Sequence, residues 1–248
     1  MRYFLTLAYR GTPFCGWQRQ PNATSVQEHI EKALSTILRE TIEVTGCGRT
    51  DAGVHASYYV AHFSTEKPLP PTLVIGLNSI LPPDIAIYTC QPVHETAHAR
   101  YDAYERAYEY HIALRKTPFA QNGVWIYPQA QRLDTDLLQA TAALFPQFEA
   151  FFPFCKTHSG VEHYRCTLTK AHWDIQPENH RLVFHVTANR FLRGMVRLMV
   201  GSCIQVGMKQ LPLQAVQNAL EQQTALPKNL SVPPDGLYLT KILYPYPV

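Results

Sequence analysis

The chain has 248 residues, of which 46% are hydrophobic and 17% are charged, so it can bury a sizeable core and is not a disordered chain. Its formal net charge of +3 is too small to predict a nucleic-acid partner by itself. The N-terminal residues contain no long apolar leader, no run of residues is apolar for long enough to cross a membrane, and none of the 6 cysteines forms a C-x-x-C pair. These features predict a cytoplasmic protein with reduced thiols.

The first half of the chain alternates between strand and helix patterns. Residues 2–9 are rich in β formers and alternate in polarity, which predicts a strand. Ser25 and Glu28 have the spacing of a capping box, and apolar residues at helical spacing follow as far as Leu38, which predicts a helix. We expect further strands over 42–47, 57–64 and 85–91, a short helix after Pro70 and Pro71, and either helix or strand over 99–115.

The second half has a similar but looser pattern. Pro118, Asn122 and Gly123 cluster where we expect the two halves to join, over 105–130, so we divide the chain into halves at 1–105 and 106–248. Asp134 can cap a helix that extends to Phe145. We expect strands over 161–175, 181–189 and 237–244, and helices that begin near Phe191 and at Pro212. The fold class that this order predicts is α+β, with two similar sheet-and-helix halves.

A literal H-E-x-x-H motif runs from His94 to His98. On a helix, the two histidines would share one face and bind zinc, with Glu95 as the base. Pro92 and a strand-like run lie directly upstream and leave little room for such a helix. We therefore interpret the motif as a chance occurrence, reject a zinc protease, and expect no metal site.

The loop from Gly48 to Gly53 places one carboxylate, Asp51, beside Arg49. The two glycines allow a tight turn and the close approach of a ligand. Such an aspartate could be a nucleophile, a general base or a metal ligand, but the loop offers no second carboxylate to support a metal. An aspartate that only holds its own turn would explain the same sequence.

Arginine and tyrosine recur over the stretch from Arg100 to Tyr110. In a strand, Tyr104, Arg106, Tyr108 and Tyr110 would lie on one face. Arginine beside aromatic rings suits an unstacked RNA base next to a phosphate. A ladder of aromatic side chains that stabilises a sheet is an equally good explanation.

No acidic residue occurs between Glu178 and Glu221, which favours a polyanionic partner, although an ordinary solvated basic face has the same composition. We expect Arg193 and Arg197, four residues apart, to share one face of a helix. An arginine on a mostly apolar helix needs an anion, either a carboxylate of the fold or an RNA phosphate. The five basic residues of this stretch are Arg181, Arg190, Arg193, Arg197 and Lys209.

Taken together, these motifs resemble the bacterial tRNA pseudouridine synthase A family. The resemblance covers nearly the whole chain and rests on GRTDAGVHA (48–56), LNSILPPDI (77–85), HARYDAYERAYEY (98–110), FLRGMVR (191–197) and DGLYL (235–239). It implies an isomerase that converts uridine to pseudouridine at nucleotides 38, 39 and 40 of the tRNA anticodon stem-loop. It also implies a homodimer, and two ferredoxin-like halves joined into one mixed, mainly antiparallel sheet with an RNA-binding cleft.

The resemblance also implies roles for individual residues. Asp51 matches the catalytic nucleophile, Tyr108 the tyrosine that stacks on the substrate, and Arg197 an active-site arginine. Arg49 matches the arginine that helps to displace the target base. For substrate binding we add Arg106 and Arg193. The reaction is redox-neutral and consumes no water, so we expect no metal, nucleotide or redox cofactor.

The chain departs from the family pattern at three places. Arg10 stands where the family usually has an aspartate, and Tyr59 replaces a usual glutamine. Residues 147–153 replace a motif that usually begins with His-Asp-Phe. These departures concern the positioning of RNA. An RNA-binding module without activity is the alternative function, although such a module could dispense with Asp51.

Overall fold

The computed structural model describes residues 1–116, 118, 123–156, 160, 162–226 and 230–248. Its contacts divide the chain into two compact units, Met1–Glu105 with Tyr238–Val248, and Arg106–Leu237. The sequence-based division at 105 places residues 238–248 in the second half, whereas the structure groups them with the first unit. The reason is backbone pairing, because His55 pairs with Tyr238, and Tyr104 N donates to Leu243 O at 3.0 Å.

The first unit is built on a sheet in which β1 (Arg2–Tyr9) lies between β3 (His55–Ser64) and β4 (Ile85–Val93), antiparallel to both. Strand β2 (Thr45–Gly46) pairs antiparallel with β3, and β9 (Leu237–Leu243) pairs with β3 in parallel. Helix α1 (Val26–Leu38) connects β1 to β2, and α2 (Leu73–Ile80) connects β3 to β4. The spatial order β4-β1-β3-β2 of this β-α-β-β-α-β chain brings the end of β1 and the start of β3 together.

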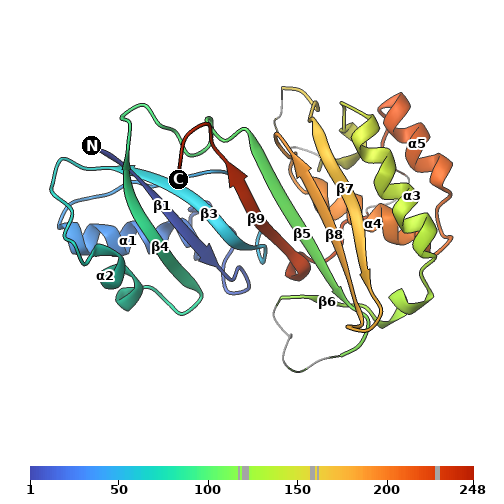
Figure 1. The fold of residues 1–248 in the computed structure, drawn as a ribbon, viewed down its shortest axis with the longest axis horizontal. Coiled ribbons are helices and arrows are strands. Elements are labelled where there is room, and N and C mark those ends of the chain that lie inside the picture. The colour runs from blue at the N-terminus through green and yellow to red at the C-terminus, as the bar shows by residue number, and fades with distance from the viewer. Residues whose placement is uncertain (117, 119–122, 157–159, 161, 227–229) are drawn as a thin grey trace. The chain divides into compact units, whose positions relative to one another are not determined.

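Helix α1 begins as its sequence predicts. Ser25 Oγ accepts a hydrogen bond from Glu28 N at 3.3 Å, which satisfies one of the free N–H groups of the first turn. Its apolar face buries Val26, Ile30 and Leu34 completely. The same unit buries Phe4, Leu5 and Leu7 of β1. Figure 1 shows α1 and α2 beside the strands of this unit.

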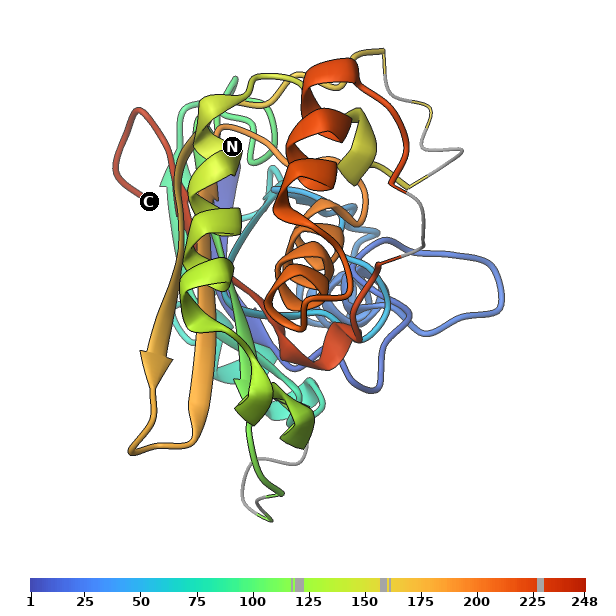
Figure 2. The ribbon, with the colours of Figure 1, turned by 90° about the vertical axis from the view of Figure 1, so that its right-hand side faces the viewer.

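The second unit has three main strands, with β8 (Arg181–Ala188) between β5 (Glu105–Ala113) and β7 (Leu168–Gln176), antiparallel to both. A short strand β6 (Trp125–Ile126) pairs with β5 in parallel. The helices α3 (Thr135–Leu144), α4 (Met195–Gly207) and α5 (Leu213–Gln222) lie on one side of these strands, as Figure 2 shows. Short 3-10 helices occur at Pro128–Arg132, Phe145–Gln147, Phe152–Phe154 and Pro234–Gly236.

The two units share one order of elements. The segments β1-α1-β2-β3-α2 and β5-α3-β7-β8-α4 follow one another in the same way, and the strand orders β1-β3-β2 and β5-β8-β7 correspond. The expected α+β class is therefore confirmed. Within the part of the chain that the structure describes, the strands pair mainly antiparallel, and the pairings of β3 with β9 and of β5 with β6 are parallel. Among the described residues, no helix is long and apolar enough to cross a membrane.

Several element boundaries differ from the predictions. The ambiguous stretch 99–115 contains the strand β5, and the strand expected over 42–47 forms only at Thr45–Gly46. The strand expected from 161 begins at Leu168, and residue 161 lies outside the described residues. The helix expected near Phe191 begins at Met195, because Gly194 has a left-handed backbone with φ of 72° that cannot continue a helix.

Candidate active site

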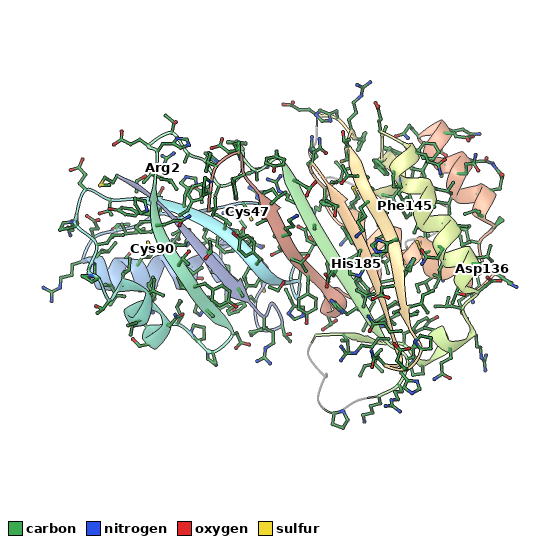
Figure 3. All side chains as sticks on the ribbon, in the orientation of Figure 1. Arg2, Cys47, Cys90, Asp136, Phe145 and His185 are labelled. Carbon is green, nitrogen blue, oxygen red and sulfur yellow. The ribbon has the colours of Figure 1, made fainter. Side chains whose placement is uncertain are left out.

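The Gly48–Gly53 loop connects β2 to β3 and carries Asp51. Cys47, labelled in Figure 3, lies directly before the loop, and its N–H donates to Val60 O at 2.9 Å. Asp51 is half-buried, and Arg49 is exposed. Val54 N donates to Asp51 O at 3.2 Å, and Gly53 has a φ of 79°, which favours glycine. The tight turn expected from the two glycines is therefore present, with Asp51 at its start.

Segments from elsewhere in the first unit hold this loop. Tyr59 Oη donates to Gly48 O at 2.5 Å, and Tyr9 Oη lies 2.9 Å from Thr50 Oγ1. Gly53 N donates to Phe14 O at 3.3 Å. The backbone at residues 14–16 approaches so closely that a Cβ on Gly16 would lie 2.3 Å from Thr50 O. The loop is thus fixed by β1, by β3 and by the turn at residues 14–16.

A cavity of about 130 Å³ lies beside the loop. Gly48, Arg49, Trp17, Gln27 and Arg100 contribute to its wall. It therefore has two cationic side chains and one aromatic ring, which suits a polar, anionic ligand. No periodic pattern relates Arg100 or Trp17 to Arg49, and these residues lie far apart in the sequence, so their proximity could not be predicted from it.

In the second unit, the predicted substrate-binding residues Arg106 and Tyr108 lie on β5. They share a face with the buried Tyr110, as the period of a strand requires, whereas Tyr104 precedes the strand. The half-buried ring of Tyr108 meets Phe191 edge to face, with 5.0 Å between the ring centroids. Arg106 Nη1 donates to Asn189 O at 2.9 Å, which ties this arginine to the segment that precedes α4.

Arg197 belongs to a helix that is buried almost throughout. Every residue of α4 is buried except Arg197 and Gln205, which are half-buried. Arg197 Nε donates to Val232 O at 2.7 Å. Burial raises the pKa of the nearby Tyr110 above its ordinary value, and the positive charge of Arg197 opposes that rise. Arg197 therefore has a fixed position in the second unit.

The expectation that Arg193 and Arg197 share one helix face is wrong. Arg193 lies before the helix, in the turn that the left-handed Gly194 closes, and it is exposed. Its carbonyl oxygen accepts from Lys156 N at 3.0 Å. Of the two arginines, Arg197 alone is on α4, so the basic helix expected in the second half carries one arginine.

A protein-family model described as a tRNA pseudouridine synthase matches residues 6–102 and 149–245 of this chain. The chain belongs to the tRNA pseudouridine synthase family. It is 41% identical over 247 residues to tRNA pseudouridine synthase A of Porphyromonas gingivalis, a match that covers 98% of this chain and 97% of the relative. It is 42% identical over 246 residues to the protein of the same name from Bacteroides thetaiotaomicron, covering 98% and 91%.

The expected family and the expected isomerase class are therefore confirmed. Among solved structures, the CRISPR endoribonuclease Cse3 bound to a 19-nucleotide RNA covers 84% of this chain and 97% of its own, with 11% identity and a TM-score of 0.22. That likeness is too low to bear on fold or function. The individual roles of Asp51, Tyr108, Arg197, Arg49, Arg106 and Arg193 stay predictions.

The acid-free stretch of this pseudouridine synthase is not free of partners. Lys209 Nζ forms an ion pair with Asp134 Oδ2 at 3.2 Å. The pKa of Asp134 is lowered, first by the hydrogen bond from Leu137 N and then by Lys209. Arg190 Nη1 lies 3.1 Å from His163 Nε2. Lys209 is therefore close to a carboxylate in space, although no acidic residue lies near it in the sequence.

The H-E-x-x-H motif of this synthase follows the end of β4 and forms turns rather than a helix. His98 Nδ1 accepts from Arg100 N at 3.1 Å and from Tyr101 N at 3.2 Å, so this ring nitrogen is already used. His94 packs edge to face against Tyr246 instead. Within the described residues, no group of three or more His, Cys, Asp or Glu side chains could hold a metal ion.

The three departures from the family pattern have structural partners. Arg10 Nε forms an ion pair with Asp84 Oδ1 at 2.6 Å, so this arginine joins two segments of the first unit. Tyr59 is buried on β3 behind the Gly48–Gly53 loop. In the replaced segment 147–153, Phe151 is fully buried, and Phe152 N donates to Gln223 Oε1 at 3.2 Å.

Proposed function

We propose that this enzyme converts uridine to pseudouridine at positions 38, 39 and 40 of the tRNA anticodon stem-loop, with Asp51 as the nucleophile. Membership of the tRNA pseudouridine synthase family supports the reaction. The observation that carries the residue assignment is the Gly48–Gly53 loop, which holds one half-buried carboxylate beside an exposed arginine and is fixed by hydrogen bonds from other segments.

The reaction balances without an added group. The bond between N1 and C1′ of the uridine breaks, and a bond between C5 and C1′ forms. A proton leaves C5, and N1 takes up a proton, so no electrons are gained or lost overall. An ionised carboxylate is sufficient for this chemistry, because it can attack carbon and later leave, or accept the proton.

The remaining residues act on the substrate before and during that step. A uridine in the stem is paired and must leave the stack, and we assign Arg49 to its displacement and Tyr108 to stacking on the extruded base. We assign Arg106 and Arg193 to tRNA binding through their positive charges. We assign Arg197 a catalytic role through its guanidinium group, which offers a positive charge and several hydrogen-bond donors.

The test is the release of tritium from tRNA that carries [5-³H]uridine, since C5 loses its hydrogen in this reaction. We expect the wild-type enzyme to release tritium and Asp51→Asn to be inactive, with tRNA affinity retained, because the amide keeps the shape and removes the charge. Asp136→Asn changes an exposed carboxylate on α3 and is the matched control, with activity unchanged. An Asp51→Asn variant at a tenth of the wild-type rate or better would contradict the assignment.

An inactive RNA-binding module is the other outcome of this experiment. A wild-type protein that binds tRNA but releases no tritium would be such a module. Mapping pseudouridine in a set of tRNAs after treatment checks positions 38, 39 and 40, since a product elsewhere would contradict the proposed site.

The remaining proposals come from the resemblance and from the substrate. We infer a homodimer, which the molar mass of the pure protein in solution checks. We infer a cytoplasmic enzyme, because that is where bacterial tRNA is processed. The joining of two ferredoxin-like halves into one sheet with an RNA-binding cleft stays a prediction.

A further inference from the structure

Tyr59 is a fully buried tyrosine that the assigned roles do not use, at a position where the chain departs from the family pattern. Its ring stacks on Trp17, with 4.1 Å between the centroids and 25° between the planes. It also meets Tyr9 edge to face, at 5.5 Å and 62°. The three rings form an aromatic cluster, which we define as Tyr9, Trp17 and Tyr59, directly behind the Gly48–Gly53 loop.

The polar ends of this cluster reach the loop. Tyr59 Oη donates to Gly48 O at 2.5 Å, and Tyr9 Oη lies 2.9 Å from Thr50 Oγ1. These two contacts fall on the residues on either side of Arg49, and Thr50 directly precedes Asp51. Burial raises the pKa of Tyr59 well above its ordinary value, so its hydroxyl remains a protonated donor at any pH where the enzyme works.

The space around the Tyr59 hydroxyl is closed by the backbone of β2. A Cβ on Gly46 would lie 2.2 Å from Tyr59 Oη and 2.5 Å from Trp17 Cε2, so only glycine fits there. The ring can therefore not move toward β2, and its hydroxyl has a fixed direction. Because the loop backbone at Gly48 accepts from that hydroxyl, the fixed ring sets where the loop begins.

We propose that Tyr59 is a positioning residue, whose hydroxyl holds the backbone at Gly48 and so places Arg49 and Asp51 for turnover. It acts through the loop and does not touch the substrate. This inference rests on the proposed function, because it gives Tyr59 a purpose only if the loop carries the catalytic carboxylate. A small displacement of a reacting group lowers the rate steeply, whereas tRNA affinity depends on many contacts elsewhere.

The experiment compares Tyr59→Phe with Tyr244→Phe. Both changes remove a hydroxyl that donates at 2.5 Å to a backbone carbonyl of the first unit, but the acceptor of Tyr244 is Ala99, outside the loop. We measure the single-turnover rate of tritium release at saturating enzyme, the Kd for tRNA, and the unfolding midpoint. We expect Tyr59→Phe to lower the rate about ten-fold with an unchanged Kd, and Tyr244→Phe to keep the wild-type rate. Tyr244→Phe should lose at least as much stability as Tyr59→Phe, since the acceptor residue Ala99 is buried and Gly48 is half-buried.

Equal rates for Tyr59→Phe and Tyr244→Phe would overturn the proposal, and so would a loss that appears only in Kd. Tyr9→Phe is a second variant, which removes the other contact with the loop and should lower the rate in the same direction. The behaviour of wild type and Asp51→Asn decides the proposed function separately. If wild type is active and Asp51→Asn is inactive, a wild-type rate in both Tyr59→Phe and Tyr9→Phe overturns only the positioning role of Tyr59.

Discussion

The Gly48–Gly53 loop of the first unit and helix α4 of the second unit hold their candidate site residues in opposite ways. The loop has no regular secondary structure, and its place depends on a few specific contacts from Tyr9, Tyr59 and Phe14. Helix α4 is buried on nearly every side, so packing fixes its backbone at Arg197, and Arg197 Nε donates to Val232 O. We therefore expect substitutions that displace the loop to lower the rate of the reaction, and substitutions that disturb α4 to lower the free energy of unfolding first.

The largest effect should come from adding a methyl group inside α4. A Cβ on Gly201 would lie 1.6 Å from Leu230 O, a backbone atom that cannot turn aside. We expect Gly201→Ala to lower the free energy of unfolding by about 4 kcal/mol or more, since overpacking against backbone forces the helix to move. Denaturant unfolding of the pure protein measures this.

Gly76→Ala is the matched control, because it makes the same change in another helix. A Cβ on Gly76 would lie 3.2 Å from Ile37 Cδ1, the far end of a flexible side chain. Alanine favours a helix interior by about 1 kcal/mol over glycine, so stability should stay equal or rise. If both variants lost stability equally, the contrast drawn for α4 would be wrong.

The stability of the first unit should depend on pH in the acidic range, because of His62 on β3. Burial, followed by the charges of His98 and Arg2, lowers the pKa of His62 from 6.5 to about 4, although the negative charge of Asp102 opposes this shift. Between pH 6.5 and 4 the unfolded chain therefore binds a proton that the folded chain does not, so stability falls as the pH falls through this window. The loss attributable to His62 is on the order of 3 kcal/mol.

His62→Asn tests this expectation in unfolding experiments across the pH range. Asparagine keeps an acceptor for Ala99 N, which donates to His62 Nδ1 at 3.1 Å, and it does not titrate. Its stability should change less between pH 6.5 and 4 than that of wild type. A His62→Asn profile parallel to wild type would contradict the assignment.

A side chain that presses on the Gly48–Gly53 loop should lower stability less than Gly201→Ala does, but it should lower the reaction rate strongly. Gly16 has a φ of 93°, and a Cβ there would lie 2.3 Å from Thr50 O. We expect Gly16→Ala to lower stability by about 2 kcal/mol and the rate of tritium release by about a hundred-fold, because the loop moves. Gly48→Ala is the control for stability, since a Cβ at Gly48 would meet nothing within 4 Å. If Gly16→Ala lost stability but kept the single-turnover rate, the loop would respond to substitution as helix α4 does, and the expected difference between them would be wrong.

The same contrast explains what the sequence could predict. The caps at Ser25 and Asp134 and the turn around Asp51 are local, because the residues that form them lie within a few positions of each other. The start of α4 was placed four residues too early, because apolar spacing continues through Phe191 and does not reveal the backbone of Gly194.

Contacts between distant segments gave no sequence signal. The bond from Tyr59 to Gly48 and the ion pair between Arg10 and Asp84 join segments that only the fold brings together. The pairing of β9 with β3 is of the same kind, and it explains why residues 238–248 were assigned to the second half. Motif spacing could therefore single out Asp51 and Arg197 as candidates, but it could not predict the contacts that hold them.

The smallest effects that we expect are on the salt dependence of tRNA binding, after removal of exposed cationic side chains of the second unit. Arg193 is exposed before α4, whereas Lys209 after α4 is paired with Asp134 at 3.2 Å. A tRNA phosphate contact releases counterions, so each one adds about −0.7 to −0.9 to the slope of log K against log salt. We expect Arg193→Ala to flatten this slope by nearly that amount and to weaken all tRNAs alike, because phosphates carry no sequence information.

Lys209→Ala should change the slope less, because the lysine already has an anionic partner that a phosphate would have to replace. Its removal should instead lower stability slightly, by less than about 1 kcal/mol, as expected for an exposed ion pair. The measurement is tRNA binding by each variant over a salt series, with Lys241→Ala as the control, a lysine whose carboxylate partner Glu105 lies 3.9 Å away in the first unit. If Lys209→Ala flattened the slope as much as Arg193→Ala, its pairing with Asp134 would not persist on tRNA. If wild-type binding did not depend on salt, neither cation would contact phosphate, and the tRNA assignment of this region would be wrong.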